Sequence, residues 1–173
     1  MKVIRYIYDG MGLVSEWTGR AARWLVVIII AITVYDVFMR YILNAPTNWS
    51  WCLSYMLGAC FIAVGLAYTY YHQGNVRVDI IYSRFSPKGK LLVDIVFTLL
   101  FFFPLFFMLA RLFIQDAWFA YSVGQFDGAS IWYPLTWPFK SVVAVGFVFL
   151  CLQGTATFLK DVMALVKGGK EPW

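Results

Sequence analysis

The chain has 173 residues, of which 62% are hydrophobic, 20% are aromatic and 13% are charged. A soluble domain is typically about 45–50% apolar and about 25% charged, so this composition leaves too little polar surface for a soluble fold. The net charge of +5 does not indicate a nucleic-acid-binding protein, because the basic residues form short clusters between apolar segments. The composition predicts an all-α integral membrane protein with a single membrane domain over residues 1–173.

Four apolar segments are long enough to cross a bilayer, which requires roughly twenty residues for about 30 Å of hydrocarbon. No strict alternation of apolar and polar residues recurs, so a transmembrane β-barrel is not expected. The first segment follows about twenty mixed residues and precedes no A-x-A site, which favours an uncleaved helix over a signal peptide. Pro104 predicts a kink in the third span, because proline removes a backbone donor. The expected spans are residues 21–41, 51–71, 91–114 and 139–159.

The distribution of lysine and arginine predicts the orientation. Eleven of them fall in the amino-terminal tail, the loop between spans 2 and 3 and the carboxyl-terminal tail. Only Arg40, Arg111 and Lys140 fall on the other side. Because cytoplasmic loops carry the excess of positive charge, both termini are expected in the cytoplasm.

Aromatic residues gather at the opposite, outer boundary, where their polar N–H and O–H groups suit the headgroup zone. The segment from Gln115 to Trp137 is expected to contain a short interfacial helix, broken at Gly124 and Gly128. An irregular loop with aromatic anchors is the alternative. The outer tryptophans are Trp49, Trp51, Trp118, Trp132 and Trp137.

Two features inside the spans suggest contacts. Asp36 and Arg40 lie one helical turn apart, which lets them pair. They could form an ion relay or a neutralised pair, and we favour the pair because no second membrane carboxylate stands ready to continue a relay. Ser54 and Gly58 form a small-x-x-x-small motif in span 2, which predicts close packing against another helix, in this chain or beyond it.

The sequence contains no motif that is typical of catalysis or of cofactor binding. The three cysteines form no C-x-x-C pair, and His72 is the single histidine, which excludes a bis-histidine haem within this chain. No nucleophile triad or phosphate-binding loop is present. We therefore expect no catalytic residues, no metal and no cofactor in this chain, and we do not expect an enzyme.

One stretch of the sequence indicates a particular protein family more specifically than the composition does. The pattern R-Y-x-x-N-x-P-x-x-W begins at Arg40, and after one span it is followed by V-R-V-D over residues 76–79. With four spans and this length, residues 20–160 resemble the small membrane subunit of tripartite ATP-independent periplasmic (TRAP) transporters, the DctQ-like family. The matching positions are Asp36, Arg40, Tyr41, Asn44, Pro46, Trp49, Arg77 and Asp79. Together with Ser54 and Gly58, these are the candidate structural and partner-interface residues.

The resemblance implies a scaffold subunit of an ion-gradient-driven importer of organic anions such as carboxylates, located in the bacterial inner membrane. It would brace a large multi-span subunit, which is expected to bind the coupling sodium ion, and help dock a periplasmic substrate-binding protein. Membrane lipids would be its other partners. A self-sufficient four-helix exporter, with Asp36 as its carboxylate, and a membrane-embedded redox subunit are the alternatives.

The sequence departs from the family pattern at one position. The family commonly has a glutamate before the leucine that opens span 2, and here that position is Cys52. A cysteine supplies no fixed negative charge at neutral pH unless its pKa is lowered. Any interaction that depends on that carboxylate is therefore in doubt for this chain.

Overall fold

The computed structural model describes residues 2–72, 86–128 and 131–166, and within them it contains four helical spans. The third span is continuous but includes a π-helical segment, η1, between two α-helical parts. The expectation of four membrane helices is confirmed. The elements are α1 (Lys2–Tyr41), α2 (Ser50–Tyr71), α4 (Pro87–Phe97), η1 (Thr98–Phe102), α5 (Phe103–Val123) and α6 (Trp137–Val166).

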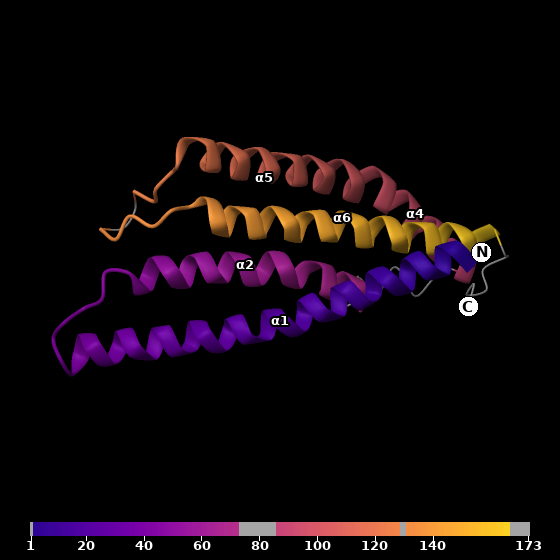
Figure 1. Cartoon of the computed structure of the whole chain (residues 1–173). Coiled ribbons are helices and arrows are strands. Elements are labelled where there is room, and N and C mark those ends of the chain that lie inside the picture. Colours follow the sequence, from indigo (N-terminus) through magenta and orange to yellow (C-terminus); the bar gives the residue numbers. More distant parts are fainter. Residues whose placement is uncertain (1, 73–85, 129–130, 167–173) are drawn as a thin grey trace.

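The helices lie side by side with alternating direction (Figure 1). The α1–α2 connection (residues 42–49) and the α5–α6 connection (residues 124–136) lie at one end of the bundle, which we call the hairpin end. The start of α1 and the end of α6 lie at the opposite end, the terminal end (Figure 1). The two termini of the described chain are therefore on the same side of the bundle.

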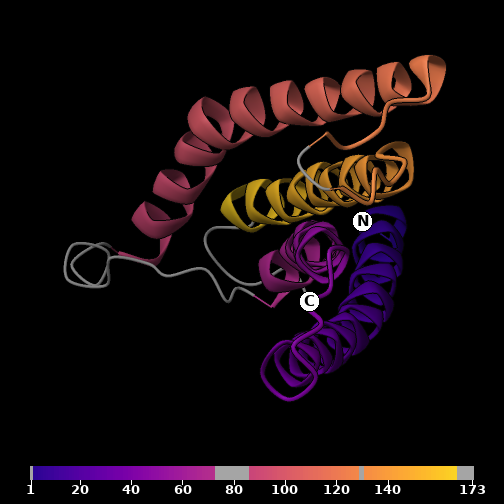
Figure 2. The same cartoon turned by 90° about the vertical axis from the view of Figure 1, so that its left-hand side faces the viewer.

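The centre of the bundle is formed by α2 and α6. Viewed from the hairpin end, they lie between α1 on one side and α5 on the other (Figure 2). In the most apolar stretch of each span, 44% of the residues of α6 and 33% of those of α2 are buried, against 6% in α1 and none in the third span. The two outer helices therefore present most of their apolar surface to lipid or to a partner.

Small residues allow α2 and α6 to approach backbone to backbone. Ala63 and Ala67 of α2 are buried. A Cβ atom placed on Gly146 of α6 would lie 2.7 Å from the carbonyl group of Ala63, a distance that real Cβ atoms do not adopt. The close packing predicted for span 2 therefore occurs within this chain. It involves the face of α2 that carries Ala63 and Ala67, which we call the alanine face. Gly58 is different, since a Cβ atom placed there would have no neighbour within 4 Å.

The first helix is longer than its expected span, because α1 begins at Lys2 rather than near residue 21. Its added turns pack against the terminal ends of α2 and α6. Gly12 and Gly19 leave room for the rings of Tyr71 and Tyr68, and the buried Ser15 donates a hydrogen bond to Gln153 of α6 at 3.1 Å. Hydropathy alone could not reveal this extension, because these contacts are tertiary.

The third span bends where the sequence predicts a kink. Pro104 has no N–H, and its ring crowds the carbonyl one turn earlier, so the regular ladder of hydrogen bonds cannot continue through this turn. The residues before it form η1, and the helix changes direction there (Figure 2). Insertions of this type are a known cause of sharp helix bends. The ring of Phe102 at this bend packs against Gly154 of α6.

The expected interfacial helix between Gln115 and Trp137 is wrong. Residues up to Val123 continue α5, which ends at Gly124 in the left-handed conformation that glycine tolerates at a helix end (φ 62°). The connection that follows contains no helix in residues 124–128 and 131–136; it forms an antiparallel bridge between Phe126 and Leu135. Backbone hydrogen bonds across this bridge, from Asp127 to Pro134 and from Thr136 to Gln125, pair N–H and C=O groups that would otherwise be paired within a helix.

Candidate functional site

Asp36 links α1 to the α1–α2 connection at the hairpin end. Its carboxylate forms an ion pair with Arg40, at 2.8 Å, and accepts a hydrogen bond from the hydroxyl of Thr47 in the connection. The predicted pair is confirmed, and the hydrogen bond from Thr47 joins the last turns of α1 to the segment that leads to α2.

The ion pair is asymmetric in exposure. The side chain of Asp36 is 14% exposed, whereas that of Arg40 is 53% exposed. The carboxylate is therefore occupied within the chain and fixes the arginine. Most of the guanidinium group remains accessible and can make further hydrogen bonds, since arginine carries five N–H donors. This arrangement suits contact with another molecule better than proton transport by Asp36.

The rest of the R-Y-x-x-N-x-P-x-x-W motif shapes the connection. Asn44 adopts a left-handed conformation (φ 49°), which asparagine tolerates. The N–H of Ala45 donates a hydrogen bond to the carbonyl of Met39 at 3.0 Å. Trp49 stacks on Tyr35 of α1 with ring centroids 5.9 Å apart. Both backbone and aromatic contacts therefore fix the conformation of this turn.

Aromatic rings around this turn are exposed. Tyr41 is 76% exposed, and Trp51 and Tyr55 form a stacked pair on the outside of α2, with ring centroids 6.2 Å apart. These rings lie on helices rather than on a flexible loop. Together with Arg40 they make up a group of exposed residues at the hairpin end, which we call the aromatic–arginine face: Arg40, Tyr41, Trp51 and Tyr55.

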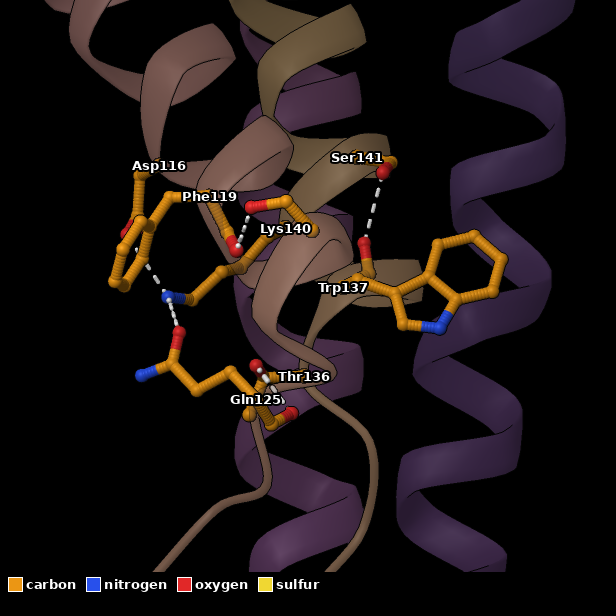
Figure 3. A network of polar contacts seen from close by, with 8 residues as sticks. Asp116, Phe119, Gln125, Thr136, Trp137, Lys140 and Ser141 are labelled. Atoms are coloured by element: carbon orange, nitrogen blue, oxygen red, sulfur yellow. Dashed lines mark hydrogen bonds and ion pairs between the residues drawn. The ribbon is translucent and has the colours of Figure 1, made fainter.

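A second polar cluster fixes the α5–α6 connection. The ammonium group of Lys140 lies between the carboxylate of Asp116, at 2.9 Å, and the side-chain carbonyl of Gln125, at 3.0 Å (Figure 3). Thr136 donates from both its backbone N–H and its hydroxyl to the carbonyl of Gln125. Sequence reasoning missed this cluster, because Asp116 and Lys140 are 24 residues apart and lie on different helices.

Cys52 links the two halves of the hairpin end. It is fully buried, and its thiol donates to the carboxylate of Asp127 at 2.9 Å. The position where the resemblance led us to expect a glutamate thus has a carboxylate beside it, supplied by the α5–α6 connection. No local sequence pattern indicates this contact, because the two residues are 75 positions apart.

The remaining candidate residues are more separate. Ser54 and Gly58 are half-buried on α2, and Pro46 is exposed in the connection. Arg77 and Asp79 lie outside the described residues. In the part of the chain that the structure describes, no group of three or more histidine, cysteine, aspartate or glutamate side chains could hold a metal ion. The polar contacts at the hairpin end join helices and connections.

Comparison with known families identified one match. The family model described as "Tripartite ATP-independent periplasmic transporters, DctQ component" matches residues 29–164. The matched range covers most of the chain and includes both polar clusters of the hairpin end. A comparison with curated proteins gave no match.

Proposed function

Because the chain belongs to the DctQ component family of tripartite ATP-independent periplasmic transporters, we propose that it is the small membrane subunit that braces the large, translocating subunit of such an importer. The proposal extends to organic anions such as carboxylates as substrates. In this scheme the large subunit binds the substrate and the coupling sodium ion, and the present chain positions that subunit in the inner membrane. The hairpin end would face the periplasm and help dock the substrate-binding protein.

The observation that carries the proposal is the aromatic–arginine face. Arginine, tyrosine and tryptophan are the residues that most often dominate binding energy at protein interfaces. Here the arginine is oriented by Asp36, and Trp51 and Tyr55 already stack on each other. An oriented, rigid face loses less conformational entropy on binding than a flexible one.

The alternative of a self-sufficient exporter requires a carboxylate that is free to exchange protons. The carboxylate of Asp36 is engaged by Arg40 and by Thr47, and it is largely buried. This arrangement counts against the exporter and favours a subunit that acts through contacts.

The test is a gentle-detergent pull-down of the tagged chain from its native membrane, read by mass spectrometry, together with substrate uptake. Arg40→Ala is expected to reduce recovery of the large subunit about tenfold, equivalent to about 1.4 kcal/mol of binding free energy. Uptake should fall in parallel, and the affinity of the periplasmic protein for substrate should not change.

Arg20→Ala is the matched control. Arg20 also lies on α1 and also pairs with an acidic residue one turn earlier, Glu16, at 2.8 Å, but it lies near the middle of α1, far from the hairpin end. Recovery of the large subunit should be unaffected by this change. Loss of uptake by Arg40→Ala with a fully assembled complex would contradict a bracing role, as would recovery of the wild-type chain without any large partner.

A further inference from the structure

Arg111 differs from the other basic residues that the sequence places on the outer side. Arg40 pairs with Asp36 and Lys140 pairs with Asp116, both within 3 Å. Arg111 is exposed on α5, and its side chain makes no hydrogen bond or ion pair with any residue in the described ranges. An arginine inside an apolar span is costly unless an anion or water compensates its charge, so a group outside these residues is expected to do so.

A groove of about 360 Å³ adjoins Arg111 between α5 and α6. Its lining includes the small, buried side chains of Ala110 and Cys151. Gln115, one turn toward the hairpin end, adds a second polar group, and the groove continues past Phe107 and Thr155 toward the middle of the span. The hydroxyl of Thr155 is already bonded to the carbonyl of Cys151, at 2.8 Å. The lining of the groove is therefore almost entirely apolar, with Arg111 and Gln115 on the hairpin side.

The depth of Arg111 suits a lipid headgroup. Trp118 and Tyr121 are exposed on the same helix and mark the headgroup zone. Arg111 lies seven residues below Trp118, which is about 10 Å along a helix. The long side chain of an arginine can extend from this depth to the interface while its methylene groups stay in hydrocarbon.

We propose that this groove binds a membrane phospholipid. Arg111 would donate hydrogen bonds to the phosphate, in the bidentate geometry that a guanidinium group allows, and the amide of Gln115 would add another. One acyl chain would lie in the groove, past Phe107 toward Thr155. A carboxylate of another protein chain at this depth would itself have to lose its hydration, whereas a lipid phosphate already lies at the interface.

The experiment is native mass spectrometry of the full chain, released from nanodiscs that contain palmitoyl-oleoyl phosphatidylethanolamine and phosphatidylglycerol. The wild type is expected to retain a phospholipid after most of the surrounding lipid is removed. Arg111→Gln should lower the retained fraction about tenfold. Arg20→Gln, an identical change at an arginine that is already paired with Glu16, should retain lipid like the wild type.

A second variant tests the groove itself. Thr155→Leu keeps the charge of Arg111 but fills the apolar end, and leucine is a good helix former, so the fold should persist. It should also lower lipid retention. Equal retention by the wild type and Arg111→Gln would overturn the proposal, and so would a purified complex in which Arg111 pairs with an acidic residue of the large subunit. Because retention is measured on this chain alone, its result does not depend on the proposed bracing role.

Discussion

At the scale of single residues, Asp36 shows which contacts a sequence can reveal. Its pairing with Arg40 is predictable, because residues four apart in a helix share one face. Its contact with Thr47 depends on how the connection closes over the end of α1, and no local pattern encodes that closure. The same holds for Cys52 and Asp127, where the structure places a carboxylate beside a cysteine from a distant part of the chain.

The contact between Thr47 and Asp36 should stabilise the hairpin end measurably. Thr47→Val preserves the shape of the side chain but leaves an oxygen of a largely buried carboxylate without its donor. Losing this partner should destabilise the hairpin end. We expect a lower midpoint of thermal unfolding for the purified protein in detergent.

Thr33→Val provides the control for this measurement. Thr33 lies on the same helix, and its hydroxyl donates only to the carbonyl of Ile29 in the preceding turn, at 2.8 Å. Its replacement should leave the unfolding midpoint near that of the wild type. Equal midpoints for the two variants would show that the Asp36–Thr47 contact contributes nothing to stability.

At the scale of helices, the small residues of α2 serve two faces. The alanine face is used inside the chain, where Gly146 of α6 approaches the backbone of Ala63. Ser54 and Gly58 belong to a face with open space around Gly58. The sequence predicted that span 2 packs closely, but it could not assign each face to an internal or an external neighbour, because both environments are apolar.

Leucine substitutions should separate these two faces. In Gly146→Leu the new side chain meets the backbone of Ala63, which can move only if α2 and α6 separate, so a loss of about 3 kcal/mol or more is expected. Gly58→Leu should fold with the stability of the wild type, as judged by thermal unfolding in detergent. If the open face contacts the large subunit, the same variant should recover less of that subunit in the pull-down. Similar destabilisation by both substitutions would contradict this division of α2.

The third span illustrates a different limit of prediction from sequence. The predicted kink at Pro104 is present, because it follows from the covalent chemistry of proline. The far end of the same span differs from the expectation, because the aromatic residues after Gln115 do not form a separate interfacial helix. They continue α5 instead, up to the helix-ending conformation of Gly124. Aromatic composition locates the interface along the sequence, but it does not determine whether a helix continues through it.

At the scale of the whole molecule, the order of the helices was not predictable. All four spans are strongly apolar, so mean hydropathy does not distinguish the central helices, α2 and α6, from the outer ones. The number of spans and the side shared by both termini follow from length and composition, and the structure agrees with them (Figure 1). The direction in which the bundle crosses the membrane rests on the distribution of lysine and arginine alone.

That direction can be measured with single cysteines and a membrane-impermeant maleimide on spheroplasts. The three native cysteines are buried, so they should give a low background. Asn48 is exposed at the hairpin end and Lys88 is exposed at the opposite end of the third span. Asn48→Cys should react in intact spheroplasts, whereas Lys88→Cys should react only after lysis. The reverse result would place the aromatic–arginine face in the cytoplasm, where it could not help dock a periplasmic protein, although it could still brace the large subunit within the membrane.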